Sequence, residues 1–266
     1  MENPVFRQNV VIITGASMGI GRELAFQFAK QGAWLALAAR NAEKLEEVSQ
    51  QCRQRGGRSI SIPTDVAYQA QCQNLVEETI TEYGRIDTLV NNAGVGHDEK
   101  FDQLKDFLTL EKVMQVNFWG SLYCTHYALP YLKKSAGRIV CISSLRGKYP
   151  GATADGYVAS KYALTGFFDS LRIELARSGV SVTTIYPSWV STGISSRSLR
   201  PDGTPSGKIS KHEQGAMPVD VCSRRIIQAI ARRKREDVMT LQGKAGLWLR
   251  LILPGVVDQI AKKESE

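Results

Sequence analysis

A tyrosine and a lysine four positions apart, Tyr157 and Lys161, are the residues of this sequence best suited to acid–base chemistry. Residues four apart lie on one face of a helix, so the phenol and the ammonium would be neighbours. A nearby cation favours the phenolate, which makes the phenol usable as a general acid or base. Such a pair alone is usually a surface contact. Here Ser144, thirteen residues earlier at the end of a predicted strand, brings a hydroxyl to the same edge.

A glycine-rich turn near the N-terminus predicts a nucleotide site. It follows an unbroken apolar run at residues 10–14 and opens a predicted helix. Glycines let the backbone approach a pyrophosphate, and the free N–H groups of a helix N-terminus attract phosphate. The spacing GxxxGxG differs from the GxGxxG fingerprint, and packing alone is the alternative reason for three glycines. The residues expected to hold the cofactor here are Gly15, Ser17, Gly19, Ile20 and Gly21.

The end of the second predicted strand bears on the choice between NADP and NAD. Folds that prefer NAD place an acid there for the ribose 2′-hydroxyl. This strand ends at Arg40, and the first acid is Glu43. A guanidinium suits a 2′-phosphate, so the sequence favours NADP(H) over NAD(H), with stacking of Arg40 on the adenine as the alternative. Asp65 and Val66, after the third predicted strand, are candidates for the adenine, unless Asp65 only caps the next helix.

Strands and helices that alternate along the chain must position these residues. Alternation of this kind predicts right-handed crossovers and a parallel sheet that binds ligands at the carboxyl ends of its strands. We therefore expect an α/β fold of the Rossmann type, a doubly wound, mainly parallel seven-stranded sheet with helices on both faces. The predicted strands are residues 10–14, 34–39, 59–63, 86–90, 138–143, 180–186 and 238–241, and the predicted helices are 21–31, 43–55, 70–83, 108–134, 157–177 and 219–231.

Length and composition predict one dinucleotide-binding catalytic domain over residues 1–266. The apolar fraction of 43% and the charged fraction of 23% are those of a globular protein. Residues 191–217 form a long polar stretch, expected to be a loop over the substrate, and residues 243–266 form a C-terminal helical extension. His97, His126 and His212 are too scattered for a metal site, so we expect no metal.

Several features concern the compartment. No apolar run reaches the roughly 18 residues of a spanning helix, and the first ten residues lack the apolar core of a signal peptide. The five cysteines form no CxxC pair, which argues against a disulfide scaffold. These features predict an intracellular, cytoplasmic protein, with peripheral membrane association as the alternative.

In the order of its motifs the sequence resembles the short-chain dehydrogenase/reductase family, in its common single-domain branch. The resemblance covers residues 9 to 192. Its motifs are the turn at 14–21, Asn91-Asn92-Ala93-Gly94 after the fourth strand, Asn117 in the next helix, Ser144 with Tyr157 and Lys161, and Pro187 after the sixth strand.

The resemblance implies a role for each matching residue. Tyr157 would protonate a carbonyl oxygen during hydride transfer and act as the base in reverse, while Ser144 would hydrogen-bond to that oxygen. Lys161 would bind the cofactor ribose and tune Tyr157. Asn117 would hold a water of a proton relay and distort its helix. Further cofactor residues would be Asn92, Pro187, Val190 and Thr192, and the family's subunit contacts imply a homodimer or homotetramer.

Two positions depart from the family pattern. Ser188 stands where the family usually has glycine, which places a side chain beside the nicotinamide pocket. Met18 stands where NADP-using members often carry a second basic residue, which weakens the NADP assignment without reversing it. The expected substrate contacts, Leu145, Tyr149 and Trp189, are apolar or aromatic and predict a hydrophobic carbonyl or alcohol, such as a steroid, a retinoid, a simple ketone or an acyl thioester.

The formal charge of +8 is concentrated near the C-terminus, where residues 193–266 hold 14 Lys/Arg and 8 Asp/Glu. The apolar stretch 246–257 within that region suggests an interfacial membrane helix, or packing of Leu247, Leu251 and Ile252 on the domain or at a subunit interface. Because Pro254 and Gly255 interrupt the apolar face, the sequence favours packing. No aromatic residues interleave the basic ones, so we expect no nucleic-acid partner.

The sequence as a whole predicts an NADP(H)-dependent carbonyl reductase or alcohol dehydrogenase of this family. An NAD-linked dehydrogenase of the same family is one alternative. A regulator that senses NADP without turnover is another, although such a protein has no need of a paired phenol and ammonium.

Overall fold

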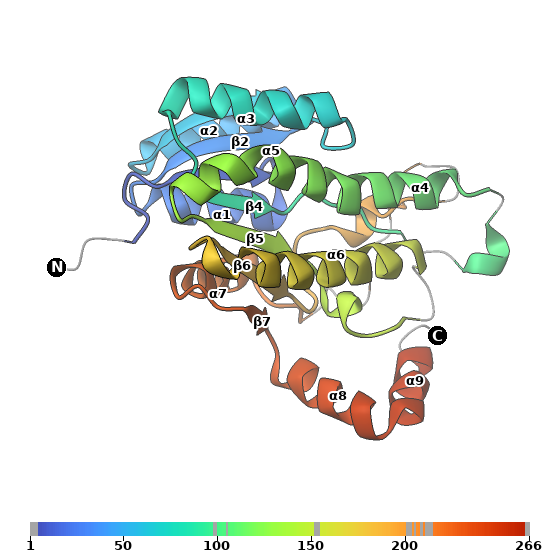
Figure 1. The fold of residues 1–266 in the computed structure, drawn as a ribbon. Coiled ribbons are helices and arrows are strands. Elements are labelled where there is room, and N and C mark those ends of the chain that lie inside the picture. Colours follow the sequence, from blue (N-terminus) through green and yellow to red (C-terminus); the bar gives the residue numbers. More distant parts are fainter. Residues whose placement is uncertain are drawn as a thin grey trace.

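Seven parallel strands form one sheet at the centre of the chain, in the order β3-β2-β1-β4-β5-β6-β7 (Figure 1). The computed structural model describes residues 5–97, 100–104, 106–151, 155–200, 204, 206–207, 210 and 215–263. The strands are β1 (Val10–Thr14), β2 (Trp34–Ala39), β3 (Arg58–Pro63), β4 (Thr88–Asn91), β5 (Arg138–Ile142), β6 (Ser181–Tyr186) and β7 (Glu236–Val238). The order reverses between β1 and β4, the place where such sheets bind nucleotides.

Helices cover both faces of the sheet, and the two at the C-terminus lie apart from it. The helices are α1 (Gly19–Ala29), α2 (Ala42–Gln54), α3 (Gln69–Tyr83), α4 (Leu108–Met114), α5 (Gly120–Lys134), α6 (Asp155–Glu174), α7 (Val219–Ala231), α8 (Leu241–Ile252) and α9 (Pro254–Lys263). A π turn, Gln115–Trp119, joins α4 to α5. The expected doubly wound Rossmann-type fold is confirmed. Within the described residues, no helix is both long and apolar enough to cross a bilayer.

Strand β1 shows why the two faces each acquire a core. Successive side chains of a strand point to opposite faces, and all of these are apolar and fully buried. Val11 and Ile13 join the core under α1, α2 and α7, whereas Val10 and Ile12 join the core under α3, α5 and α6. A strand covered on both faces requires an unbroken run of apolar residues, and β1 provides one. Thr14, at the carboxyl end of this strand, lies at the edge of the sheet where ligands bind.

Two elements differ from their predictions. The last strand, β7, begins two residues before the predicted range of 238–241 and ends at Val238. Its buried acid, Asp237, is accommodated inside the sheet because it forms ion pairs with Arg225 and Lys234. The predicted helix 108–134 is interrupted by the π turn. Both features depend on contacts with other elements, which a local pattern of apolar residues does not report.

Candidate active site

The glycine turn between β1 and α1 is folded as tightly as the sequence suggested. Gly15 and Gly19 have φ angles of +67° and +56°, a region that side chains with a Cβ rarely adopt. A Cβ on Gly21 would lie 2.3 Å from the carbonyl oxygen of Gly15. The first turn of α1 thus packs directly on the backbone of the turn, and its unpaired N–H groups lie at the ligand edge of the sheet.

Hydrogen bonds from β4 hold this turn in place. The hydroxyl oxygen of Thr14 accepts the backbone N–H groups of Asn92 and Ala93, both at 3.0 Å. In return Nδ2 of Asn92 donates to the carbonyl oxygens of Thr14 at 2.8 Å and Gly15 at 3.3 Å. The end of β4 and the glycine turn are therefore one rigid unit.

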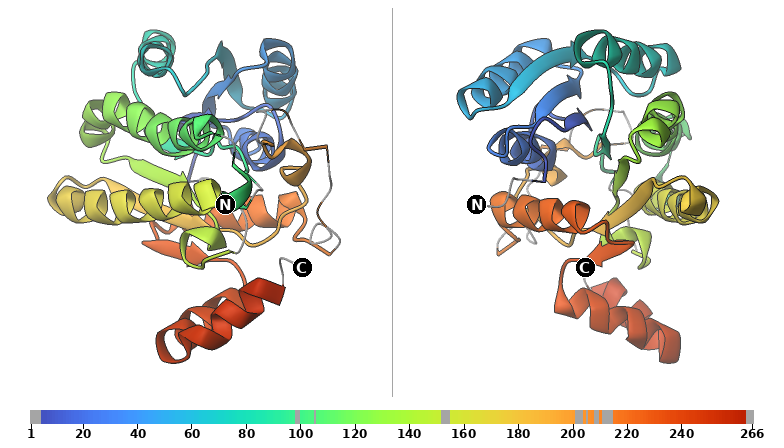
Figure 2. Two further views of the ribbon diagram at one scale, coloured as in Figure 1. Left: turned by 90° about the vertical axis from the view of Figure 1, so that its right-hand side faces the viewer. Right: turned by 60° about the vertical axis from the view of Figure 1, so that its left-hand side comes forward.

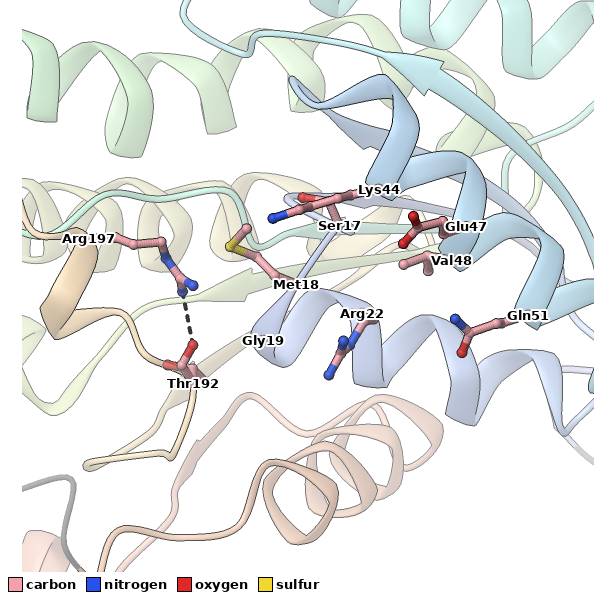
Figure 3. A pocket seen from close by; sticks show the side chains of 10 residues that line it. All are labelled: Ser17, Met18, Gly19, Arg22, Lys44, Glu47, Val48, Gln51, Thr192 and Arg197. Atoms are coloured by element: carbon pink, nitrogen blue, oxygen red, sulfur yellow. Dashed lines mark hydrogen bonds between the residues drawn. The ribbon is translucent and has the colours of Figure 1, made fainter. Parts of the chain in front are cut away.

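A pocket of about 370 Å³ opens beside the turn and has a basic lining (Figure 3). Arg22 and Lys44 lie in the first turns of α1 and α2. A positive charge at a helix N-terminus is repelled by the helix dipole and destabilises the helix. Asn41 caps α2 by accepting the N–H of Lys44 at 2.8 Å, which fixes the position of that turn. The lining residues are Ser17, Met18, Gly19, Arg22, Lys44, Glu47, Val48, Gln51, Thr192 and Arg197.

The cations that line this pocket are not the one that the sequence predicted. Sequence reasoning found Arg40 but missed Lys44, Arg22 and Arg197, although Lys44 follows Arg40 by four residues and Arg22 follows the third glycine directly. Arg40 itself is exposed at the end of β2 and does not line the pocket. Met18, where a basic residue was looked for, lies beside side chains that supply the charge from neighbouring elements.

The segment after β6 closes on the glycine turn from the other side. Thr192 lies so near Gly19 that a Cβ on this glycine would be 3.3 Å from the Thr192 Cβ. The carbonyl oxygen of Thr192 accepts a hydrogen bond of 3.0 Å from Nη2 of Arg197 (Figure 3). Val190 is buried and pairs with Met217 as an isolated bridge, which anchors both ends of the 191–217 segment.

Lys161 and Tyr157 are neighbours on α6, as their spacing predicted. The ammonium nitrogen lies 5.5 Å from the centroid of the Tyr157 ring and donates to the carbonyl oxygen of Ile142 at 3.0 Å. Lys161 is only 5% exposed. Ser144 follows Ile142 by two residues, and its hydroxyl oxygen accepts the N–H of Arg146 at 3.2 Å. The end of β5 therefore meets α6 at the predicted catalytic pair.

Asn117 lies inside the π turn, which is the local distortion of the helix that the resemblance implied. Its Oδ1 accepts the N–H of Val95 at 2.8 Å, and its Nδ2 donates to the carbonyl oxygen of Val95 at 3.0 Å and to Oγ of Ser160 at 2.9 Å. A Cβ on Gly94 would lie 3.2 Å from Oδ1 of Asn117 and 3.7 Å from Nζ of Lys161. Gly94 therefore leaves room for both side chains, and Ser160 positions the amide. Sequence reasoning assigned neither of these supporting roles.

The adenine candidates have local partners. Oδ1 of Asp65 accepts the N–H of Ala67 at 3.1 Å in a local turn, and this acid does not cap the next helix, whose N-cap residue is Tyr68. Val66 is buried against Gly120. Pro187 is buried after β6, and its carbonyl oxygen accepts the N–H of Leu145 at 2.9 Å.

The three residues expected to contact substrate lie in two different environments, one exposed and one against α8. Trp189 is 38% exposed, beside the half-buried Ser188. Tyr149 donates from its hydroxyl to the carbonyl oxygen of Gly243 in α8, and burial raises the pKa of this phenol. Leu145 also contacts α8, since a Cβ on Gly243 would be 3.0 Å from its Cδ2. Tyr149 therefore packs under α8, which the sequence did not predict.

Cys141, in β5, adjoins the catalytic pair. Burial raises the pKa of its thiol to about 12, although the Lys161 ammonium acts in the opposite direction, so the sulfur stays protonated. In the described parts of the chain, no group of three His, Cys, Asp or Glu residues could hold a metal ion. His212 lies outside those parts.

Comparison with known proteins decides the family. The model of the short chain dehydrogenase family matches residues 9–202. The chain belongs to the short chain dehydrogenases. It is 44% identical over 188 residues to 11-beta-hydroxysteroid dehydrogenase-like 3 of Arabidopsis thaliana, a match covering 70% of this chain and 60% of the relative. This match spans less than two thirds of that relative's length. Identity to 11-beta-hydroxysteroid dehydrogenase-like 4A of the same plant is 34% over 263 residues, or 98% of this chain and 86% of the relative.

Solved structures of short chain dehydrogenases share the fold. A short chain dehydrogenase/reductase from Burkholderia phymatum, in complex with NAD, superposes with a TM-score of 0.84 at 24% identity over 96% of each chain. An alcohol dehydrogenase from the archaeon Thermococcus sibiricus, complexed with 5-hydroxy-NADP, has a TM-score of 0.72 at 24% identity, covering 83% of this chain and 89% of that one. These likenesses bear on the fold alone.

Proposed function

We propose that this short chain dehydrogenase transfers hydride between NADP(H) and a carbonyl or secondary alcohol, with Tyr157 as the general acid and base. The observation that carries the proposal is the buried Lys161 ammonium, 5.5 Å from the Tyr157 ring and fixed by the carbonyl oxygen of Ile142. The cation held at that depth lies beside the phenol that would give and take the proton.

The neighbouring residues complete the proposed mechanism. Ser144 would donate its hydroxyl proton toward the substrate oxygen as negative charge develops there. Lys161 would bind ribose hydroxyls and lie beside the Tyr157 phenol. Asn117 would hold a water of the relay that returns the proton to solvent, while Ser160 and Val95 keep its amide in position.

The glycine turn would suit a dinucleotide, because its backbone is folded tightly at Gly15, Gly19 and Gly21 and carries no side chain there to keep a pyrophosphate away. When bound there, the cofactor would supply or accept the hydride. Asn92 would form the floor of its site, with Ser17 and Ile20 at the start of α1 and with Asp65 and Val66 near the adenine. Pro187, Val190 and Thr192 would line the nicotinamide end, where the Ser188 side chain would narrow the space.

The preference for NADP(H) over NAD(H) is proposed from charge. Arg22 and Lys44 are placed where helix dipoles disfavour cations, which makes sense if an anion such as the 2′-phosphate neutralises them. Arg40 adds a third cation at the end of β2. Replacing Arg40 and Lys44 by alanine should weaken NADPH binding at least about tenfold and leave NADH binding unchanged. Lys30→Ala, an exposed lysine at the other end of α1, is the control. Equal losses for both cofactors would contradict the preference.

The proposed substrate is hydrophobic, and the 191–217 segment would cover it, with Trp189 and Leu145 near its entrance. Two plant relatives are named as 11-beta-hydroxysteroid dehydrogenase-like proteins, so a panel of ketones and alcohols should include hydroxysteroids. A homodimer or homotetramer through α5 and α6 is also proposed. Trp119, 44% exposed and stacked on Tyr123, is the type of residue that such an interface covers.

Replacement of Tyr157 by phenylalanine tests the reaction. We expect kcat to fall by about 100- to 10,000-fold with NADPH affinity retained, because only the proton donor is lost. Turnover is followed by the absorbance of the reduced nicotinamide, and affinity by fluorescence titration. Undiminished turnover would refute the mechanism. A wild-type protein that binds NADPH but turns over no member of the panel would favour a regulator instead.

A further inference from the structure

Helix α8 turns most of its large apolar side chains away from the domain, whereas a helix packed on a protein core turns them inward. The side that faces the domain carries Gly243, Gly246, Arg250 and one half-buried apolar residue, Leu247. Each glycine contacts Leu145 or Tyr149, and the guanidinium donates to the carbonyl oxygen of Lys148 and the hydroxyl of Tyr162. The opposite side carries the apolar residues Leu241, Trp248 and Ile252, spaced by seven and four positions. In a helix that packs on its own domain, the apolar side faces inward.

The C-terminal hairpin, defined here as α8 and α9 (residues 241–263), projects from the body of the domain as a separate arm (Figures 1 and 2). Its apolar side chains are exposed. Among the described residues, seven of the sixteen exposed large hydrophobic side chains lie in these 23 residues. They are Leu241, Trp248, Leu251, Ile252, Leu253, Val256 and Ile260, with exposed fractions from 42% to 84%. An exposed apolar group of this density marks an interaction surface.

This exposure settles one earlier alternative. The sequence favoured packing of Leu247, Leu251 and Ile252 on the domain or at a subunit interface. Packing on the domain is wrong for Leu251 and Ile252, whose side chains are 77% and 73% exposed, whereas Leu247 is half-buried. Pro254 begins α9 and does interrupt the apolar face, as expected, but α9 folds back on α8 and adds Val256 and Ile260 to the exposed set. The hairpin thus forms a broad apolar surface from two short helices.

The charges of the hairpin select the partner. Apart from Arg250, which faces the domain, residues 241–263 contain the three lysines Lys244, Lys262 and Lys263 but a single acid, Asp258. Two copies of such a surface would bring like charges together around the apolar contact, which opposes self-association. An anionic lipid surface attracts the same lysines while it accepts the apolar side chains. Trp248, 70% exposed, is of the residue type enriched at the boundary between lipid and water.

We propose that the C-terminal hairpin docks this dehydrogenase on the surface of anionic membranes. Helices of 12 and 10 residues would lie along the interface, with Trp248, Ile252 and Leu241 inserted among the acyl chains and Lys244 near the head groups. The lipid-facing side is the side of α8 opposite Tyr149, so docking leaves the contacts between α8 and the domain intact. The inference is independent of the cofactor and of the reaction.

Co-sedimentation of the full chain with vesicles tests the proposal. One set of vesicles is phosphatidylcholine, and the other is phosphatidylcholine with phosphatidylglycerol in a three-to-one ratio. We expect more protein to pellet with the anionic vesicles, and pelleting to decrease as salt screens the lysines. Trp248→Ser/Ile252→Ser should reduce binding at least about tenfold, because two large side chains lose their burial. Val221→Ser, an exposed apolar residue of α7, should bind like wild type.

A second variant separates insertion from misfolding. Trp248→Phe keeps an aromatic side chain, so it should pellet like wild type and yet lose the blue shift of tryptophan fluorescence that accompanies insertion. Circular dichroism checks that each variant is folded. Equal pelleting of the Trp248→Ser/Ile252→Ser variant and wild type would overturn the proposal. So would an absence of binding together with dissociation of that variant from oligomer to monomer, because the surface would then be a subunit interface.

Discussion

Gly21→Ala tests whether the close approach of α1 to the glycine turn is what the cofactor site requires. Gly21 lies in the first turn of α1 and is buried. A Cβ there would be 2.3 Å from the carbonyl oxygen of Gly15 and 2.5 Å from Nδ2 of Asn92. Neither atom can move alone, because Asn92 is hydrogen-bonded to Thr14 and the Gly15 oxygen belongs to the backbone.

The size of the effect follows from these distances. Ordinary van der Waals contact begins at 3.4 Å, so the first turn of α1 must move by about 1 Å from the glycine turn. That shift displaces the N–H groups proposed to bind phosphate, and a misplacement of about 1 Å costs on the order of 100-fold. We therefore expect NADPH affinity to fall about 100-fold, with a loss of about 1–3 kcal/mol in the free energy of unfolding from overpacking.

Fluorescence titration with NADPH and chemical denaturation measure the two effects. Gly166→Ala is the matched control, a glycine in the interior of α6 whose added Cβ meets no atom within 4 Å. The control should bind NADPH like wild type and gain about 0.5–1 kcal/mol of stability, the usual benefit of alanine over glycine in a helix. If Gly21→Ala also binds NADPH with unchanged affinity, the close approach is unnecessary and the reasoning fails.

Three further predictions concern ionised and buried groups. Burial raises the pKa of Asp237, but its hydrogen bonds and ion pair with Arg225 outweigh this and hold it below 3.8. Asp237→Asn should therefore lower the free energy of unfolding by about 2–3 kcal/mol at neutral pH, and this deficit should shrink as the pH falls below 3.8. Cys141, with its pKa raised to about 12 by burial, should resist iodoacetamide in the folded protein at mildly alkaline pH and react in urea, as read by mass spectrometry. Thr14→Val should cost about 1–3 kcal/mol in urea denaturation, because the N–H of Asn92 and that of Ala93 lose their acceptor.

Each of the three has a clear contrary result. A deficit of Asp237→Asn that stays constant down to acid pH would mean that the carboxylate charge contributes nothing. Alkylation of Cys141 at the rate of the unfolded chain would show that β5 opens readily. For the threonine, Thr81→Val on the exposed side of α3 is the control. Equal costs at positions 14 and 81 would show that the buried acceptor has no special role.

The sequence predicts most of the sheet and much of the candidate site because both are encoded locally. A strand buried on two faces needs an unbroken apolar run, as in β1, and its carboxyl end must then carry the next polar residues to the ligand edge. Tyr157 and Lys161 are neighbours by helix geometry alone. Nothing in their placement depends on the rest of the molecule, apart from the strand end that supplies Ser144.

The features that escaped prediction depend on neighbours from other elements. The strand β7 contains a buried acid, and only the ion pair with Arg225 makes it acceptable there. Lys44, in α2, lines the same pocket as the glycine turn before α1. The spacing of residues within one helix cannot predict such a contact between two elements. Tyr149 packs under α8, a helix more than ninety residues further along the chain. Which side of α8 is exposed likewise cannot be predicted until the side that packs on the domain is known.

Because Asn117 lies in a π turn between α4 and α5, its position depends on the number of residues in this segment as well as on their types. An α-helix turns by about 100° per residue, and the π turn accommodates one residue more than the regular path would hold. Deleting a neighbour of Asn117 within Gln115–Trp119 would remove the π turn and shift Asn117 by one position along a regular helix, a rotation of about 100° for its side chain. The amide that now meets Val95 and Ser160 would then point elsewhere, with no side chain altered. An exchange of amino acid at one of the other four positions is thus a milder change than a gap, and an alignment that opens a gap here would misplace the later residues of the helix.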